Sequence, residues 1–249
     1  MRREFDSPEP ISVIVEAFVG HISVIAGDRT STVVEVRADD QDRRLDVETV
    51  EQTRAEYSKG ELRVRTPRPP SSEQPSSRAH GVIEIVIEVP TGSRVRADTE
   101  MGNIRTEGSL GNCRLTSSLG DIHIDTAGAV ESTTSMGTTT VGTVTGELRA
   151  RSVNGDISLG TAESDVTATT TAGSIRVDRI TQGRIRLETT MGELDIGVRS
   201  GTTAVLDLHT DFGWVRNDLD PAESPHYSDK AAEIQARVTT GNIIVRRTS

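Results

Sequence analysis

The sequence predicts an all-β, single-domain β-solenoid, similar to a β-helix, with about 18 residues per turn and two short strands per rung. Three observations predict it: a glycine that recurs at a near-constant interval, alternation of apolar and polar residues on both sides of that glycine, and an unusual composition. Aromatic residues make up 2% of the 249 residues, and Val, Ile, Leu and Ala supply most of the 33% that are hydrophobic. A thin, repeated core of β-branched side chains suits this composition better than one thick core.

The recurring glycine opens a strand-like segment in each copy. Clear copies are Met101-Gly102-Asn103-Ile104, Leu119-Gly120-Asp121-Ile122 and Asn154-Gly155-Asp156-Ile157. The glycines stand at positions 102, 120, 137, 155, 173, 192, 213 and 241, so most steps are 17 to 19 residues. A steady step of this length predicts that each repeat is one turn of a stacked array.

Apolar residues occupy fixed offsets from these glycines. Two residues after each glycine stand Ile104, Ile122, Thr139, Ile157, Ile175, Leu194, Val215 and Ile243. Seven residues before each glycine stand Val95, Cys113, Val130, Leu148, Val166, Ile185, Leu206 and Ile234. Alternation with a period of two, at two places per repeat, indicates two strands that each bury one face.

The domain organisation follows from where this register holds. A single domain is expected to span residues 1–249, with regular eighteen-residue repeats over 93–247. The same register also fits around Gly20, so residues 11–92 are expected to form irregular N-terminal rungs. The extra residues between repeats are most numerous in an insert at 218–231.

The irregular third contains three strand-like segments, 32–36, 61–64 and 82–89. Segment 66–80 is rich in Pro and Ser and is expected to be a loop. No long stretch has convincing helical periodicity, so no long helix is expected. This expectation has the least support over the polar run 50–59.

Charge and hydropathy limit the class of partner. The net charge of -10 argues against nucleic acid, because such affinity comes from neutralising phosphates with Lys and Arg. No apolar run approaches the roughly 18 residues that a membrane span needs, so no membrane insertion is expected. The N-terminus carries acids and prolines where a signal peptide needs an apolar region, so a cytoplasmic location is expected rather than the cell surface.

Hydroxyl residues stand three positions before most of the glycines. They are Thr99, Ser117, Thr134, Ser152, Thr170, Thr189 and Thr210. Such a ladder could bind a ligand, but the alternation places this column on the buried side, where hydroxyls bond to the backbone or to one another. We interpret the column as structural.

The outer face of the first strand in each repeat carries both charges. Its arginines are Arg94, Arg96, Arg114, Arg149, Arg151, Arg184, Arg186 and Arg237. Its acids are Asp98, Glu131, Glu147, Asp165, Glu188, Asp207 and Glu233. This balance predicts an interleaved, solvated ion-pair surface; a groove for a polyanion is the alternative, although it has no aromatic platforms for bases.

Acidic or amide residues directly follow several of the glycines. They are Asn103, Asp121, Asp156, Glu193 and Asn242. A calcium-binding repeat would use such residues, but calcium rolls repeat at shorter spacing with clustered glycines. One Gly-Asx pair per turn better fits a corner where Gly adopts positive φ and Asx bonds the local backbone.

Residues that could support catalysis are scattered. A polysaccharide-cleaving enzyme would need paired carboxylates, for which Asp121, Asp125 and Asp156 are the best placed, and Trp214 is expected to lie rungs away from them. The histidines, which predict no metal set, are His21, His80, His123, His209 and His226. The single cysteine, Cys113, occupies a core column and is expected to be a small buried hydrophobe. No catalytic residue, metal or cofactor is therefore expected.

Three motifs carry a resemblance to a known family. They are the recurring Gly-Asp-Ile, the segment Ile87-Glu88-Val89-Pro90-Thr91-Gly92, and the segment Phe212-Gly213-Trp214-Val215-Arg216-Asn217-Asp218-Leu219. Together they resemble the bacterial putative-adhesin family of β-strand-repeat domains, a family of unknown function, especially its actinobacterial members. The resemblance covers about Ile11 to Arg247. It implies a β-solenoid and, by name, adhesion, and it supplies no catalytic or ligand residues.

Three functional hypotheses follow. The leading one is a non-catalytic interaction or scaffold protein that binds a protein partner, or a second copy of itself, through its ends or faces, because open ends expose strand edges. The second is a surface adhesin that binds glycan or protein. The third is a carbohydrate-active enzyme on a β-helix scaffold.

Overall fold

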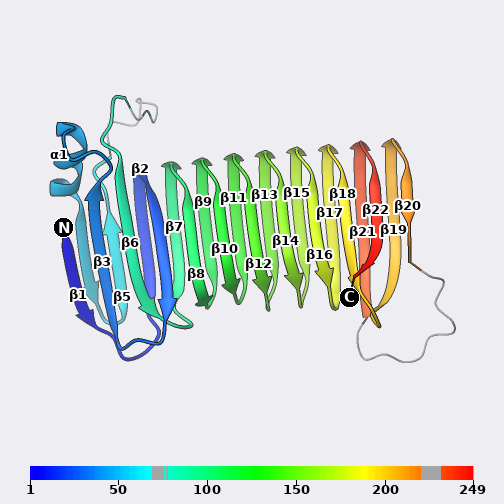
Figure 1. Ribbon diagram of the computed structural model, residues 1–249, viewed down its shortest axis with the longest axis horizontal. Coiled ribbons are helices and arrows are strands. Elements are labelled where there is room, and N and C mark those ends of the chain that lie inside the picture. The colour runs from blue at the N-terminus through cyan, green and yellow to red at the C-terminus, as the bar shows by residue number, and fades with distance from the viewer. Residues whose placement is uncertain (69–75, 77, 220–230, 249) are drawn as a thin grey trace. The chain divides into compact units, whose positions relative to one another are not determined.

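The computed structural model describes residues 1–68, 76, 78–219 and 231–248. The chain divides into two compact units, Met1–Ala127 (unit 1) and Gly128–Ser249 (unit 2), each described by itself below. Both are built from two-stranded rungs, with one strand of each rung in sheet A and the other in sheet B (Figure 1). The predicted all-β solenoid is confirmed, whereas the single continuous domain stays a prediction. Most of the predicted loop 66–80 and of the insert 218–231 lies outside the described residues.

The regular part of unit 1 is organised around one long strand, β2 (Ser12–Gly27), which turns at Gly20 from sheet B into sheet A. Its parallel partners are β5 (Glu61–Arg65) and β7 (Arg94–Met101) in sheet B, and β6 (Ile83–Pro90) and β8 (Ile104–Leu110) in sheet A. Strands β9 (Cys113–Leu119) and β10 (Ile122–Ala127) add the next rung. The pairing of Val13 with Val95 and of Ile22 with Ile104 confirms the register predicted around Gly20.

The outer end of unit 1 is antiparallel, which the expectation of irregular rungs did not include. Strand β1 (Arg2–Asp6) pairs with β3 (Ser31–Ala38), β3 pairs with β6, and β4 (Arg54–Ser58) pairs with β5, all antiparallel. Side chains then join the two edge strands. Arg3 donates a hydrogen bond to the carbonyl of Ala55 (2.7 Å), and the rings of Phe5 and Tyr57 stack at 5.1 Å.

A short helix, α1 (Arg44–Gln52), packs beside β3 and β6 of unit 1. The sequence pattern did not indicate it, and the run 50–59 turns out to hold the end of this helix and strand β4. The reason is that α1 has no apolar stripe: Asp46 is its one buried residue. Tertiary contacts, rather than amphipathic periodicity, hold the helix in place.

The described residues of unit 2 form six rungs whose strands run parallel to those of the rungs beside them. Sheet B contains β11 (Val130–Met136), β13 (Leu148–Asn154), β15 (Val166–Ala172), β17 (Gly183–Met191), β21 (Ala231–Thr240) and β19 (Thr203–Phe212), in that order. Sheet A contains β12 (Thr139–Val144), β14 (Ile157–Ala162), β16 (Ile175–Ile180), β18 (Leu194–Arg199), β22 (Ile243–Thr248) and β20 (Val215–Asn217).

The last two rungs of unit 2 are not stacked in sequence order. The final repeat, β21–β22, lies between β17–β18 and β19–β20, so β19–β20 is the outermost rung (Figure 1). Burial explains the order. Ile234 and Ile243 of the inner rung are fully buried, whereas β20 carries exposed Asn217 at an offset where most repeats have an apolar residue. Burying that amide without a partner would cost free energy.

The recurring glycines form a ladder at the corner between the two sheets. Gly173 has φ +151°, and a Cβ there would lie 2.3 Å from the carbonyl oxygen of Gly155 in the adjacent rung. Gly192 has φ +153°, and its Cβ would lie 2.0 Å from the oxygen of Gly173. Both the backbone conformation and the close approach exclude a side chain, which explains the repeat.

Candidate functional site: the outermost rung of unit 2

Several residues of the hydroxyl column have the predicted structural role, whereas the hydroxyls of Thr99 and Ser152 are buried without a hydrogen-bond partner. Ser117 donates to the carbonyl of Gly102 (2.9 Å), and Thr189 donates to that of Gly173 (2.8 Å). Both side chains are buried, and each bond joins one rung to the corner glycine of its neighbour. A hydroxyl engaged in this way is not available to a ligand.

The residues after the glycines form a second ladder. The side-chain oxygen of Asp156 accepts a hydrogen bond from the backbone N–H of Ser174 (2.7 Å), and that of Asn103 accepts one from Asp121 (2.9 Å). We expected these side chains to bond their own turn, but they bond the next rung. Among the described residues, no group of three or more His, Cys, Asp or Glu side chains is placed to hold a metal ion.

The outer face of sheet B carries the predicted mixture of charges. Arg96 pairs with Asp98 (3.1 Å) on one face of β7, and Arg149 of β13 pairs with Glu147 (2.8 Å), which directly precedes that strand. A shallow pocket of about 290 Å³ on this face is lined by acids and arginines together, including Asp165. Exposed pairs of this kind contribute little stability, and the balanced charge does not form a groove for a polyanion.

The carboxylates best placed for catalysis are divided between the two units. Asp121 and Asp125 belong to unit 1 and Asp156 to unit 2. Asp125 accepts a hydrogen bond from the N–H of Gly108 (3.0 Å). Burial raises the pKa of the Cys113 thiol to about 12, so at neutral pH it stays protonated and is a poor nucleophile, as expected for a buried hydrophobe.

The described histidines stand in separate environments. His21 accepts a hydrogen bond from the N–H of Asn103 (3.2 Å), His80 packs edge-on against Phe18, and His209 pairs with Asp211 (2.9 Å). His226 lies outside the described residues.

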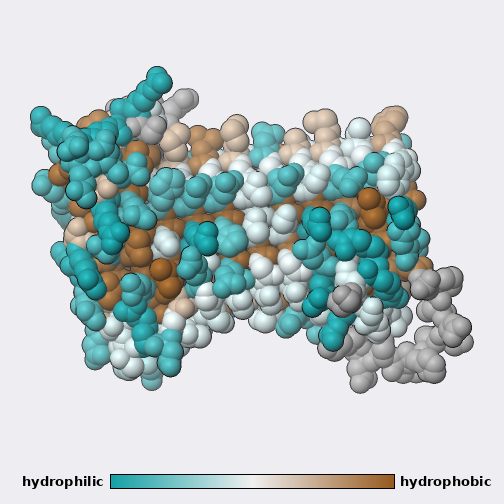
Figure 2. Space-filling model, in the orientation of Figure 1, coloured by the Kyte–Doolittle hydropathy of each residue, from teal (hydrophilic) through white to brown (hydrophobic). Residues whose placement is uncertain are grey.

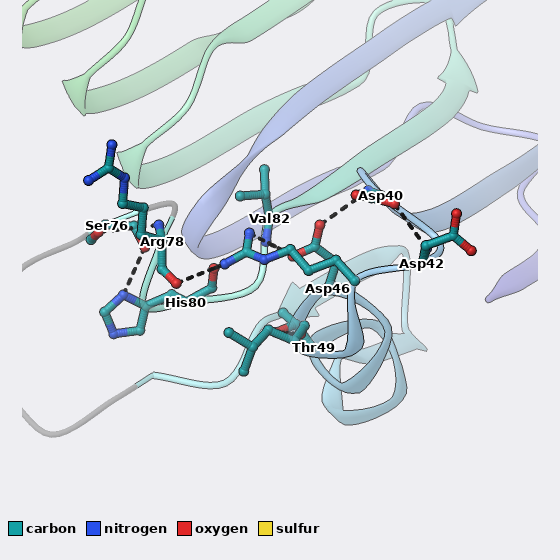
Figure 3. A network of polar contacts seen from close by, with 10 residues as sticks. Asp40, Asp42, Asp46, Thr49, Ser76, Arg78, His80 and Val82 are labelled. Carbon is teal, nitrogen blue, oxygen red and sulfur yellow. Dashed lines mark hydrogen bonds and ion pairs between the residues drawn. The ribbon is translucent and has the colours of Figure 1, made fainter.

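One buried carboxylate, Asp46, has a structural role that the sequence did not reveal (Figure 3). It is 1% exposed and accepts hydrogen bonds from the N–H groups of Asp40 (3.1 Å) and Val82 (2.9 Å). Arg43 lies 3.1 Å from it and donates onward to the carbonyl of His80 (3.1 Å). The network ties helix α1 to the chain entering β6. Both oxygens of the Asp46 carboxylate are therefore engaged within the fold.

The outermost rung of unit 2, β19–β20, is the surface that these structural roles leave unexplained. Four apolar side chains are exposed there: Val205 at 65%, Phe212 at 72%, Trp214 at 49% and Val215 at 42%. Val215 stands at a core offset, where Ile243 of the adjacent rung is fully buried. In this part of the described chain the solenoid core therefore opens to solvent.

Apolar side chains also line the corner that leads to this rung. Met136 and Met191 are both 56% exposed and stand directly before corner glycines, as Phe212 does. Figure 2 shows apolar side chains projecting at intervals along this edge of unit 2. Phe212 on the outermost rung thus repeats the position of these two methionines.

Hydrogen bonding at the outermost rung is one-sided. Among the described residues, β19 pairs with β21 alone and β20 with β22 alone. The backbone groups on the other side of Ala204–Phe212 meet no described strand. An edge of this kind is a template for pairing with another chain.

Sequence reasoning missed this site for an identifiable reason. Column alignment assigned Leu206 and Val215 to the core, which is correct for an internal rung, and sequence order made β19–β20 internal. The available signals were Asn217 at a core offset and Phe212 and Trp214 at a corner that is otherwise poor in aromatic residues.

The comparisons with known proteins agree with the fold. The family model described as Toastrack DUF4097 matches residues 13–246. The structure of a putative adhesin from Bacteroides fragilis NCTC 9343 is similar, with a TM-score of 0.53 and 14% identity over 98% of this chain and 96% of that chain. A putative adhesin from Parabacteroides distasonis ATCC 8503 matches with a TM-score of 0.44 and 11% identity over 100% and 96% of the two chains. No curated protein matches significantly. No described helix is long and apolar enough to cross a membrane.

Proposed function

The chain belongs to the Toastrack DUF4097 family, and from that premise we propose that it is a non-catalytic, adhesin-like interaction or scaffold protein that binds a protein partner through the β19–β20 rung. The observation that carries the proposal is the exposure of Val205, Phe212, Trp214 and Val215 on one rung with a one-sided strand edge. Exposed aromatic side chains at the centre of an apolar patch are typical of binding surfaces.

Further observations support an interaction role over catalysis. Many residues of the other regular columns have structural partners: Thr189 bonds a corner carbonyl, Asp156 bonds the next rung, and outer arginines such as Arg96 and Arg149 pair with acids. We also propose a cytoplasmic location and a place among the actinobacterial members of the family, the latter on the Gly-Asp-Ile and Phe212-Gly213-Trp214 motifs. Cell fractionation tests the location, and a majority of the native chain at the cell surface would contradict it.

Site-specific photo-crosslinking in cells tests the proposed binding surface. A photoreactive amino acid at Phe212 is expected to capture one protein, identified by mass spectrometry, because this side chain is 72% exposed beside the open edge. The matched control places the same amino acid at Arg149, on the ion-pair face of an internal rung. The captured protein should then bind purified wild-type chain and lose affinity for a Phe212→Ser variant. No specific adduct at 212, or the same adducts from both positions, would refute the proposal.

A second candidate, an adhesin that binds glycan, is favoured by one observation. Trp214 is 49% exposed and lies near Phe212 in sequence, and aromatic rings of this kind can stack on sugar faces. A glycan array should then show binding that a Trp214→Ala variant loses. Catalysis is tested separately: if Asp121→Asn and Asp156→Asn variants lost glycan cleavage that the wild type performs, the chain would be an enzyme.

A further inference from the structure

The free strand edges of the two units differ in chemistry. In unit 1, edge strand β1 has the sequence Arg2-Arg3-Glu4-Phe5-Asp6, and edge strand β4 carries Arg54 and Glu56. Charged, short edge strands resist pairing with another chain, and the Arg3 and Phe5 contacts to β4 close this end further. In unit 2 the edge strand β19 is 10 residues long and its inward positions include Leu206 and Leu208, which are only partly buried.

Charges on the open rung are already compensated within the chain. Asp207 accepts hydrogen bonds from Arg237 (3.0 Å) and Gln235 (3.1 Å). Asp211 pairs with His209, and Arg216 lies 2.8 Å from Asp218. An approaching strand therefore meets an apolar edge bordered by charged side chains that already have partners within the chain, despite the net charge of -10 for the whole chain.

The open rung also matches a second copy of itself. A second β19–β20 rung has the same width, the same two strands and the same inward Leu206, Leu208 and Val215 columns, so its apolar face can cover this one. A two-fold axis at the open end leaves two arrangements, β19 against β19 or β19 against β20. In both the facing strands run antiparallel, the pairing with well-formed ladder hydrogen bonds.

From these observations we infer that the partner of the β19–β20 rung is a second copy of this chain, and that the two copies form a closed two-fold dimer. The inference rests on the proposed binding role of this rung and names its partner. Closure follows from chemistry. In the described part of each chain one edge is open and apolar, and the other edge strands, β1 and β4, are charged. An isologous contact between like edges ends at two copies, whereas a head-to-tail contact would continue into fibres.

Sedimentation velocity of the full chain over two orders of magnitude in concentration tests the dimer. The wild type should shift from monomer to dimer and stop there. Val205→Lys or Val215→Lys should raise the dimer dissociation constant by about tenfold or more, because a lysine at the edge opposes strand pairing. Val153→Lys is the matched control, since Val153 is 49% exposed on an internal rung, and it should leave the dissociation constant unchanged.

Two further measurements keep the outcome clear. Far-UV circular dichroism should show that the three lysine variants keep the wild-type fold, and hydrogen exchange of the β19 amides should slow as the wild-type concentration rises. A strict monomer at all concentrations, oligomers that grow past two copies, or equal weakening by Val153→Lys would each overturn the inference. The proposed function would still stand if crosslinking from position 212 captured a different protein, so the two failures are distinguishable.

Discussion

At the residue scale, the most constrained polar group in unit 1 is the carboxylate of Asp46. It accepts two backbone hydrogen bonds and pairs with Arg43, which in turn holds the carbonyls of Arg78 and His80. Removing it would leave a partly buried guanidinium and two backbone N–H groups without an acceptor. A buried polar group that is left without a partner destabilises the fold by more free energy than its hydrogen bond or ion pair contributes when it is made.

We therefore predict that Asp46→Ala lowers the free energy of unfolding of unit 1 by about 3 kcal/mol, measured by chemical denaturation. Asp42→Ala provides the control. Asp42 is exposed, and the hydrogen bond recorded for it is donated by its backbone N–H, so a change within about 0.5 kcal/mol is expected. Equal losses in the two variants would contradict the anchoring role.

At the scale of elements, buried hydroxyls differ in whether they have a hydrogen-bond partner. Thr170 in β15 is 2% exposed and donates to the carbonyl of Gly155 (3.0 Å). Thr139 in β12 is fully buried at an offset where most repeats carry Ile, Leu or Val, and its hydroxyl has no hydrogen-bond partner. The same residue type is thus stabilising in one strand and destabilising in the other.

Replacing each threonine with valine should change stability in opposite directions. Thr139→Val removes an unpaired buried hydroxyl and should raise the free energy of unfolding by about 1 kcal/mol. Thr170→Val removes a made hydrogen bond and should lower it by about 1 kcal/mol. Thermal and denaturant unfolding measure both, and a shift of the same sign in both variants would contradict the difference between the bonded and the unbonded hydroxyl.

The corner glycines act at the same scale, because they set how closely the rungs stack. Gly173→Ala should destabilise unit 2 by about 3 kcal/mol or more, since it combines a disfavoured φ with a backbone clash. Gly27→Ala is the comparison, because no atom lies within 4 Å of a Cβ placed there, and a change within about 0.5 kcal/mol is expected. If Gly173→Ala had the same free energy of unfolding as the wild type, the proposed reason for the recurring corner glycine would be wrong.

At the scale of the whole molecule, the order of the last two rungs decides which surface is exposed. With β21–β22 placed inside, Ile234 and Ile243 are buried while Phe212 and Trp214 reach solvent. Stacking in sequence order would instead bury the polar Asn217 and expose the apolar final repeat. The observed order therefore creates the proposed binding surface.

Engineered disulfides test that order directly, in a Cys113→Ala background. Met191 and Thr240 are register partners on adjacent strands, which lie about 4.8 Å apart, within the Cα separation that a disulfide spans. Met191→Cys with Thr240→Cys should cross-link on oxidation, seen by non-reducing gel and mass spectrometry. Met191→Cys with Phe212→Cys should not, because the β21 strand lies between them. Efficient bonding of the second pair alone would establish sequential stacking.

The repeat by itself determined the local architecture. Alternation around each glycine predicted two strands per rung, their buried faces, the inward hydroxyl column and the buried Cys113, because these depend on residues a few positions apart. The corner glycines and the register at Gly20 were predictable for the same reason. These features made up most of the fold and none of the candidate site.

Only the tertiary structure decided which rungs meet and where the stack ends. The antiparallel end of unit 1, helix α1 held by Asp46, and the insertion of β21–β22 before β19–β20 all depend on contacts between residues far apart in sequence. Periodicity cannot rank such arrangements, because every rung has nearly the same columns and stacks on any other at similar energy. The choice rests on small differences, such as one amide at Asn217, and that choice exposes the edge proposed to bind.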